Sequence, residues 1–339
     1  MAGESVTLTL DAVHSLSVEV LTVNGMASDH AHAIAKVITA GQRDECDSHG
    51  LYRLIVCVRT LREGKVVPDA QPVIEDISAA ATRVDAKFGY SQLAFEMGKV
   101  SLCEKARQLG VSVLAINNCF HFSALWPEVE AIAEEGLVGL ALTPSHSWVA
   151  PAGGTRPVFG TNPIAFAWPR SGSHPFVFDF ATSAIARGDI ELHRRSGAKI
   201  PLGWALDGDG NPTEDAEKAI NGTMLTFGGH KGSALSAMIE LLGGALIGDM
   251  LSMESQRFDG GVGATPCHGE LILAFDPKML GGGNAELGQQ RAEEMFGAIT
   301  GQGARLPSQR RFDARERSIR NGVVVPVPLY QDVLKLLER

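Results

Sequence analysis

The sequence lacks the short motifs that mark the most familiar cofactor and metal sites. No G-x-G-x-x-G pattern follows an expected strand, and the nearest approach, Gly301-Gln302-Gly303, continues as Ala304-Arg305-Leu306. A dinucleotide, if bound, is therefore held by a fold other than the Rossmann fold. No HExxH motif or comparable set of closely spaced ligands is present, so we expect no metal site.

Cysteine and long apolar runs are also scarce. The five cysteines are scattered and form no CxxC pair, which excludes a disulfide framework and is typical of a reducing compartment. The best apolar candidate, residues 235–251, contains Glu240 and Asp249 and is too polar to span a bilayer. The first residues have neither the basic start nor the apolar core of a signal peptide. We therefore expect a cytoplasmic protein with no membrane partner.

Positive charge is in deficit. The chain has 30 Lys and Arg residues against 39 Asp and Glu residues, a net charge of -9. Such a chain is repelled by a phosphate backbone, and we expect no nucleic-acid partner. An anionic small molecule would need a local basic pocket. The length of 339 residues, 45% of them hydrophobic, is enough for two domains.

The hydrophobic pattern predicts a helical first part and a mixed remainder. Apolar residues three and four apart predict helices, and short β-rich runs between turn residues predict strands. The expected helices are two within residues 10–44, then 51–62, 91–109, 128–135, 231–246, 285–300 and a short one from about residue 329. The expected strands are 111–116, 138–142, 164–168, 176–180, 271–275 and 323–327.

The strongest candidate for chemistry is the segment Ser48-His49-Gly50 with Arg53. A histidine can give or take a proton near neutral pH, and a serine hydroxyl can hold the imidazole or pass the proton. The guanidinium of Arg53 can grip a carboxylate with two hydrogen bonds. On a helix that continues past Gly50, these side chains would lie near one face. A helix end with an exposed charge is the alternative.

Two basic segments are candidates for binding phosphate. Gly228-Gly229-His230-Lys231 enters an expected helix, whose first N–H groups can hold a pyrophosphate. Residues 305–311 contain three arginines and a serine, a set suited to the 2′-phosphate that separates NADPH from NADH. In both cases solvated basic residues at a turn are the alternative.

Asp189 follows an expected strand and stands near the start of a helix. It could orient His49 as the third member of a proton relay. A surface carboxylate after Gly188 is the alternative.

Five motifs stand in an order that is specific for one protein family. They are Ser48-His49-Gly50 with Arg53, Phe159-Gly160-Thr161-Asn162-Pro163, residues 179–186, the turn 206–213 and Gly228-Gly229-His230-Lys231-Gly232. On these motifs the chain resembles the type-2 malate/lactate dehydrogenase family, which also includes ureidoglycolate, sulfolactate and cyclic-imine members. The resemblance runs from about residue 8 to the end.

The resemblance implies an α/β (α+β) architecture with a non-Rossmann NAD(P)-binding fold. A central, largely antiparallel sheet would hold the cofactor, and both termini would build a helical domain. We therefore expect a helical domain from residues 1–75 and about 305–339, and a cofactor-binding domain from residues 76–304, with the substrate cleft between them. The resemblance also implies a homodimer.

The resemblance further implies roles for individual residues. Ser48, His49 and Asp189 would form the catalytic relay, while Arg53 and Thr161 would hold the substrate. NADPH, with NADH less favoured, would contact His121, Phe122, Ser123, Ala124, Leu125, Phe178, Asp179, Phe180, His230, Lys231, Arg305, Leu306, Pro307, Ser308, Arg310 and Arg311. One departure is the run Asn117-Asn118-Cys119-Phe120 before His121, where the family pattern has Ser or Gly and a second histidine. Phe120 is bulkier than Gly and could alter the fit near the nicotinamide.

Within the family, the chain is most similar to the branch that reduces cyclic imines. Residues 121–130 and Asp189, where hydroxyacid dehydrogenases more often have lysine, carry this similarity. It implies NADPH-dependent reduction of Δ1-pyrroline-2-carboxylate to L-proline and of Δ1-piperideine-2-carboxylate to L-pipecolate, with His49 as proton donor. An NAD(P)-dependent 2-hydroxyacid dehydrogenase of the same fold (malate, lactate or ureidoglycolate type) and a paralogue that has lost catalysis are the alternatives.

Overall fold

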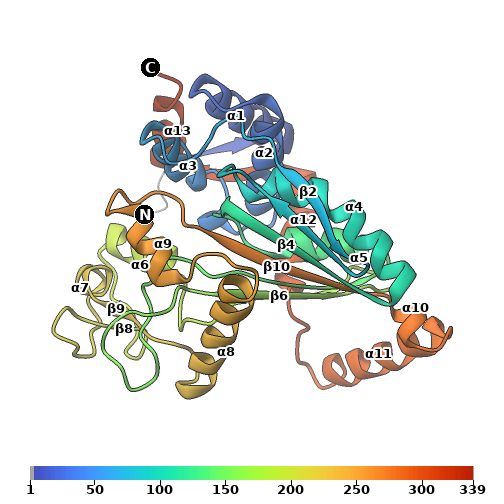
Figure 1. The fold of residues 1–339 in the computed structure, drawn as a ribbon. Helices are drawn as coiled ribbons and strands as arrows, with labels where there is room; N and C mark the ends of the chain where they lie inside the picture. Colours follow the sequence, from blue (N-terminus) through green and yellow to red (C-terminus); the bar gives the residue numbers. More distant parts are fainter. Residues whose placement is uncertain (1–3, 339) are drawn as a thin grey trace.

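The computed structural model describes residues 4–338, and its centre is a seven-stranded sheet (Figure 1). The strand order is β2-β3-β4-β10-β5-β6-β7, and every neighbouring pair except β3 and β4 is antiparallel. This arrangement confirms the predicted non-Rossmann, largely antiparallel sheet. The strands are β2 (Val73–Ser78), β3 (Ala81–Asp85), β4 (Val111–Phe120), β5 (Val138–Leu142), β6 (Pro163–Trp168), β7 (Phe176–Ala181) and β10 (Cys267–Phe275).

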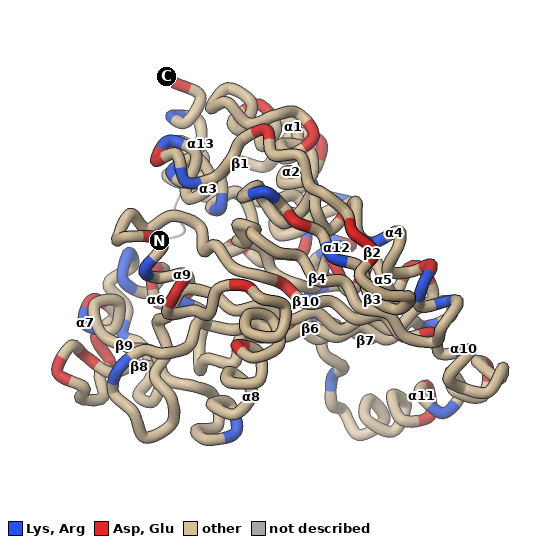
Figure 2. Tube along the Cα trace, viewed as in Figure 1, with Lys and Arg blue, Asp and Glu red and all other residues tan. Residues whose placement is uncertain are grey.

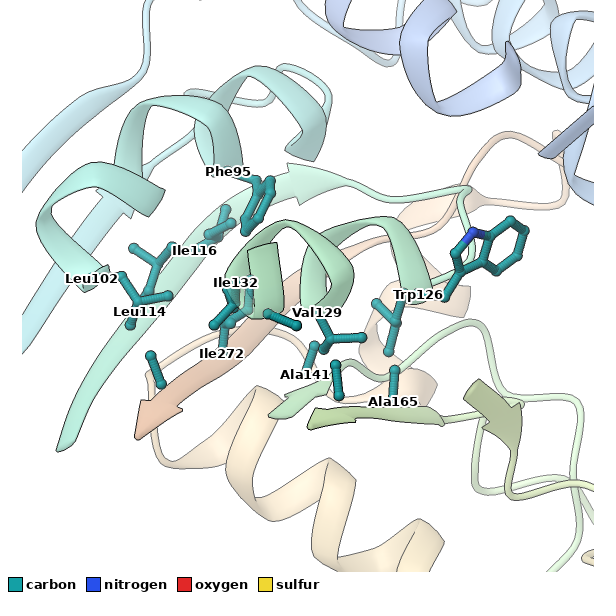
Figure 3. Close-up of a cluster of buried hydrophobic side chains, with 14 of the residues drawn as sticks. Phe95, Leu102, Leu114, Ile116, Trp126, Val129, Ile132, Ala141, Ala165 and Ile272 are labelled. Carbon is teal, nitrogen blue, oxygen red and sulfur yellow. The ribbon is translucent and has the colours of Figure 1, made fainter. Parts of the chain in front are cut away.

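Helices cover both faces of the sheet because side chains on β4 alternate between two apolar cores. Leu114 and Ile116 face helices α4 (Ser91–Leu109) and α5 (Trp126–Glu134), as Figure 3 shows. Ala115 faces the opposite side, where α8 (His230–Glu240) continues into the π-helical turn η2 (Leu241–Ala245). The strand that leads to the candidate site is therefore held from both sides.

The two ends of the chain meet in a separate layer. Strand β1 (Ser5–Leu8) pairs antiparallel with β11 (Val323–Pro326). Around this pair lie α1 (Leu10–Val23), α2 (Ser28–Arg43), α3 (Tyr52–Arg62) and α13 (Val327–Lys335), which bury a shared core. Phe120 and Phe122 from the sheet side also enter that core, so the proposed boundary at residue 75 stays a prediction.

The remaining elements form a small lobe and an arm. The lobe contains α6 (Arg187–Ser196), β8 (Ala205–Leu206), α7 (Ala216–Asn221) and β9 (Thr223–Met224), with its own apolar core. After β10, the arm of α10 (Pro277–Leu280) and α11 (Ala285–Thr300) extends from the sheet end, and a connection leads to α12 (Gln309–Asn321) (Figure 1). Helix α9 (Ser252–Asp259) precedes β10.

Most of the expected elements are present. The predictions for 91–109, 138–142 and 285–300 coincide with α4, β5 and α11. The helix expected over 231–246 changes to π geometry after residue 240, and β2 and β3 were not expected. Acidic and basic residues lie side by side on most helices (Figure 2), as in the ion pairs Arg194–Glu191 and Lys335–Asp332. Within residues 4–338, no helix has both the length and the apolar character needed to cross a membrane.

Candidate active site

Ser48 and His49 lie in a short 3₁₀ turn, η1 (Asp47–His49), that precedes α3. The Ser48 hydroxyl oxygen is 3.1 Å from Nδ1 of His49. Gly50 separates η1 from α3, so the single helix considered from the sequence is not formed. Gly50 is needed there because a Cβ would collide with the amide oxygen of Gln42, which also accepts a hydrogen bond from the Leu51 N–H at 3.2 Å.

The surroundings of His49 keep its imidazole neutral. Burial lowers its pKa well below the usual value, and the positive charges of Arg53 and His121 lower it further. The ring also meets Trp126 edge to face, with centroids 6.3 Å apart. His49 is therefore a neutral imidazole with a hydroxyl partner, set beside a permanent cation, and such a group can accept a proton and return it.

Arg53 has unused hydrogen-bonding capacity. Its Nε is buried and has no hydrogen-bond partner among the residues that the structure describes. Burial lowers the pKa of the guanidinium, while the nearby carboxyl of Asp189 acts in the opposite direction. A buried donor without a partner is costly, so this side chain is suited to an incoming carboxylate.

Helix α6 carries Asp189 to the same region. A Cβ placed on Gly188 would lie 3.5 Å from Cβ of Ser48, and the Arg195 guanidinium stands 5.5 Å from the ring centre of Tyr52. Burial raises the pKa of Asp189, and the charges of His193 and Arg53 lower it. Among residues 4–338, Asp189 makes no hydrogen bond to His49, and Arg53 is the member of the site that interacts with its charge.

Thr161 lies beside Asn162, which is hydrogen-bonded to the far end of the helix that begins with His230 and Lys231. Thr161 is half-buried just before β6, and its carbonyl accepts a hydrogen bond from the Thr182 N–H at 2.8 Å. The Asn162 side chain donates to Glu240 at 2.8 Å, which ties the start of β6 to α8. His230 and Lys231 are exposed at the first turn of α8.

Residues 121–125 form the turn between β4 and α5. Asp179 on β7 holds this turn by accepting hydrogen bonds from the N–H groups of Leu125 at 2.8 Å and Trp126 at 3.0 Å. The Phe122 ring packs against Tyr90 at 5.8 Å, away from any open surface. Phe120, the departure from the family pattern, is also buried beside Tyr90 at 6.3 Å. Its side chain therefore fills the core of the terminal helices.

His121 belongs to a buried polar cluster that sequence reasoning missed. Its Nε2 lies 3.8 Å from Glu128 on α5 and 3.9 Å from Glu270 on β10. The available signal was weak: Glu270 is a charged residue beside an apolar run, and Glu128 is one of several acidic residues after Trp126. Burial raises the pKa of Glu128 to about 7 and that of Glu270 well above its usual value.

A ring nitrogen of His121 and one carboxylate oxygen each of Glu128 and Glu270 lie within 4.8 Å of one another. Two ionised carboxylates this close would repel each other. Both carboxyl groups are buried, and both oxygens of Glu270 and one oxygen of Glu128 have no hydrogen-bond partner among the described residues. Burial lowers the pKa of His121, and the negative charges of Glu270 and Asp179 partly restore it. Burial therefore favours the protonated form of both carboxyl groups and the neutral form of the imidazole.

The third cofactor candidate, Phe178 to Phe180, lies along β7. Phe178 stacks on Phe180 at 5.2 Å, and Phe180 meets Phe227 edge to face at 5.7 Å. Phe180 is 42% exposed and offers an aromatic surface next to the turn that begins α8. That combination suits a ligand with a planar ring and phosphate groups.

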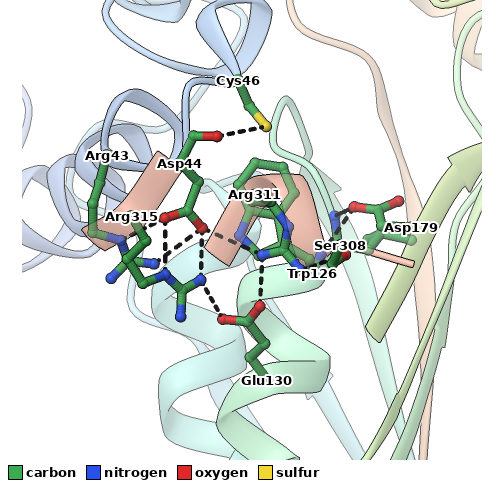
Figure 4. A network of polar contacts seen from close by, with 10 residues as sticks. Arg43, Asp44, Cys46, Trp126, Glu130, Asp179, Ser308, Arg311 and Arg315 are labelled. Atoms are coloured by element: carbon green, nitrogen blue, oxygen red, sulfur yellow. Dashed lines mark hydrogen bonds and ion pairs between the residues drawn. The ribbon is translucent and has the colours of Figure 1, made fainter. Parts of the chain in front are cut away.

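The arginines before and within α12 divide into two kinds. Arg311 is buried and bonded to Asp44 at 3.3 Å, to Glu130 and to Ser308, and its guanidinium lies 4.8 Å from the Trp126 ring centre (Figure 4). These internal partners occupy it. Arg305 and Arg310 are exposed, and no salt bridge engages them within the described part of the chain.

Comparison with known proteins agrees with this architecture. A sequence profile described as malate/L-lactate dehydrogenase matches residues 8–334. The chain is 65% identical over 333 residues to the Δ1-pyrroline-2-carboxylate reductase 1 of Burkholderia ambifaria, covering 98% of each chain. It is 57% identical over 331 residues to the Δ1-pyrroline-2-carboxylate/Δ1-piperideine-2-carboxylate reductase of Pseudomonas aeruginosa, covering 98% of this chain and 99% of the relative.

A solved structure shows the same fold. The crystal structure of Δ1-piperideine-2-carboxylate reductase from Pseudomonas syringae pvar. tomato superposes with a TM-score of 0.93 at 40% identity, covering 98% of this chain and 99% of that one. The match extends through the terminal helices as well as the sheet. The chain therefore belongs to the malate/L-lactate dehydrogenase family.

Proposed function

We propose that this protein reduces cyclic imines that carry a 2-carboxylate, forming L-proline from Δ1-pyrroline-2-carboxylate and L-pipecolate from Δ1-piperideine-2-carboxylate. The near full-length relatives described above carry reductase names for these substrates. The observation that carries the proposal in this chain is the neutral His49 beside Ser48 and Arg53. His49 would transfer a proton and Arg53 would bind a carboxylate, which are the two functions that reduction of a cyclic imino acid requires.

Substrate binding begins with Arg53. Its planar guanidinium would hold the carboxylate with two hydrogen bonds, which fixes the orientation of the ring. The half-buried Thr161 would add a hydroxyl contact from the start of β6. Arg53 belongs to the terminal helices and Thr161 precedes β6 of the sheet, so the substrate would lie between these two layers of the fold.

Proton transfer is assigned to His49. Reduction of a C=N bond needs a proton on nitrogen, because an iminium carbon is far more electrophilic than the carbon of a neutral imine. Because His49 is neutral, it would relay the proton: Nε2–H passes to the imine nitrogen while Nδ1 takes up the proton of the Ser48 hydroxyl, which solvent replaces. Asp189, the third residue of the proposed relay, would act on it indirectly, through its charge on Arg53.

The residues around β7, α8 and residues 305–311 suit a nicotinamide cofactor, which supplies the hydride when bound. Phe180 offers a stacking surface, and His230 and Lys231 stand at a helix N-terminus. We assign the preference for NADPH over NADH to the exposed Arg305 and Arg310. Arg311 would act by holding the start of α12 in place, and Leu306, Pro307 and Ser308 would shape the same loop.

We also propose a cytoplasmic homodimer. The α10–α11 arm exposes Leu280, Leu287 and Met295, each more than half exposed. Apolar side chains on a projecting arm are a usual feature of subunit contacts. Size-exclusion chromatography with light scattering tests this, and a single-chain mass of 36.0 kDa would contradict it.

A 2-oxo acid is the second candidate substrate, because the matching family profile is described by malate and lactate. The test is NADPH consumption with Δ1-pyrroline-2-carboxylate, measured beside pyruvate and oxaloacetate at equal concentrations. We expect a strong preference for the imine. Faster reduction of either keto acid would show that the protein is a hydroxyacid dehydrogenase. Asp189 would then not mark the imine-reducing branch.

A further inference from the structure

Glu128 and Glu270 are two buried carboxyl groups that no basic side chain neutralises. Glu270 is fully buried and Glu128 is 3% exposed. Within the described part of the chain, neither forms a salt bridge with a lysine or an arginine, and both oxygens of Glu270 have no hydrogen-bond partner. Buried carboxylates in proteins are paired with a cation or coordinate a metal, so this pair lacks a positive partner.

Glu130, two residues further along α5, shows how the same helix satisfies a buried carboxylate. It is 6% exposed, and it accepts hydrogen bonds from the guanidinium groups of Arg311 and, at 2.8 Å, Arg315 (Figure 4). Two permanent cations therefore balance Glu130. Glu128 and Glu270 are buried at least as deeply but have no such cations, which indicates that their partner is not a side chain.

Three different elements bring these carboxyl groups and an imidazole together. Glu270 pairs with Ile116 in the β10–β4 ladder, so its side chain lies on the sheet face that α5 covers. Helix α5 carries Glu128 to this face, and the turn after β4 carries His121. Nε2 of His121 lies 3.8 Å from Oε1 of Glu128 and 3.9 Å from Oε1 of Glu270. One nitrogen and two oxygens thus surround a single buried position.

We propose that His121, Glu128 and Glu270 bind one divalent transition-metal ion, zinc or manganese, through the imidazole Nε2 and one oxygen of each carboxylate. An imidazole with two carboxylates suits these ions, whereas calcium and magnesium favour oxygen ligands alone. In a tetrahedral site with metal–ligand bonds of about 2.0–2.2 Å the ligand atoms are roughly 3.4 Å apart, so small side-chain rotations would bring them to coordinating distance. The ion would balance both negative charges.

The ion would have a structural role. It would join the β4–α5 turn to α5 and to β10, and the burial of its ligands means that the chain takes it up on folding. Ser123 is the nearest group that can complete the coordination, because its hydroxyl oxygen lies 3.4 Å from Nε2 of His121 and accepts a hydrogen bond from Gln92 at 2.9 Å. No short motif marks the site, since its ligands stand at positions 121, 128 and 270.

The test measures the zinc and manganese content of the full-length chain by mass spectrometry, after purification without a metal-affinity column and dialysis against metal-free buffer. The variants are Glu128→Gln and Glu270→Gln, which keep the side-chain volume and remove one charged ligand each. Glu134→Gln, the same change at an exposed position on α5, is the control.

We expect about one equivalent of zinc or manganese per chain in the wild type and in Glu134→Gln, and less than about one tenth of that in Glu128→Gln and Glu270→Gln. If the wild type is purified without metal, binding of one added equivalent of ZnCl2 or MnCl2 in calorimetry, lost in both variants, supports the proposal equally. A full equivalent retained in either variant would place the ion elsewhere and overturn it. A wild type that neither contains metal nor binds the added salts would also overturn it.

If neither variant folds, the wild-type protein decides. An ion that binds only the native chain stabilises it, so the Tm should be about 5 °C or more lower in EDTA than in buffer with the metal salt. Cobalt(II) introduced in place of the native ion should show no thiolate charge-transfer band, because the proposed ligands include no cysteine. An equal Tm in the two buffers, or a thiolate band from one of the five cysteines, contradicts the proposal.

Discussion

Arg311 and Glu130 are hydrogen-bonded side chain to side chain although 181 residues separate them in the chain. The contact joins α12 to α5, and Asp44 at the end of α2 lies 3.3 Å from the same guanidinium (Figure 4). Arg315 repeats the pattern with Asp44 at 2.6 Å and Glu130 at 2.8 Å. The network therefore fixes the terminal helices against the helix that begins beside the site.

Replacing Arg311 should destabilise the protein strongly. Arg311→Ala leaves Asp44 and Glu130 buried with less compensation, and breaking a buried ion pair costs about 3–5 kcal/mol. Urea unfolding at pH 7.5 measures the change. Arg320→Ala, which removes an exposed pair with Glu316, should cost less than about 1 kcal/mol. An equal loss of unfolding free energy in the two variants would show that the buried network stabilises the protein no more than an exposed ion pair does.

Replacing His49 should slow the reaction without lowering the affinity for NADPH. His49→Asn keeps a polar side chain but cannot exchange a proton, so kcat on the imine should fall by about 100-fold or more. Ser48→Ala should cost less, since the ring loses only its hydroxyl partner. NADPH affinity, followed by quenching of tryptophan fluorescence, should be unchanged in both. Near wild-type turnover in His49→Asn would remove that residue from the mechanism.

Arg53→Lys should act on binding more than on turnover. Lysine keeps the positive charge but cannot hold a carboxylate with two parallel hydrogen bonds. We expect KM for Δ1-pyrroline-2-carboxylate to rise about tenfold or more, with kcat changed by a few-fold. Arg59→Lys, exposed on the same helix, is the control and should leave both constants unchanged. An unchanged KM in Arg53→Lys would contradict the proposed grip.

His268 should contribute to loss of stability in acid. Burial lowers its pKa to about 3, so between that value and its usual 6.5 the unfolded chain binds a proton that the native protein does not. The free energy of unfolding must therefore fall as the pH drops through this window. In His268→Asn the fall from pH 7.5 to 5.5 should be about 1 kcal/mol smaller than in the wild type. The exposed His32→Asn is the control, and an equal fall in both variants would refute this account.

Cofactor choice should depend on Arg305 and Arg310. The double Arg305→Ala/Arg310→Ala change removes two exposed cations, so KM for NADPH should rise about tenfold or more while KM for NADH changes little. Arg291→Ala, exposed on the arm, is the control. An equal rise in KM for NADPH and NADH would show that Arg305 and Arg310 do not bind the 2′-phosphate.

Local patterning was enough for elements that have one clear apolar face. The helix α11 was predictable from spacing alone, and so was β5, which is short, apolar and bounded by turns. Strand β2 was missed because all six of its residues are exposed at the sheet edge. Strand β10 begins four residues before the predicted start, since His268 and Glu270 interrupt the apolar run although both are buried.

The sequence by itself determined the family, the largely antiparallel fold and the candidates Ser48, His49 and Arg53, because these depend on residue types within short segments and on motif order. Tertiary structure alone decided which distant charges meet. It placed Asp189 on the Arg53 side of the site, occupied Arg311 with Asp44 and Glu130, and enclosed Glu128 with Glu270. Charge interactions depend on distance and burial, and chain order encodes neither for residues more than a hundred positions apart.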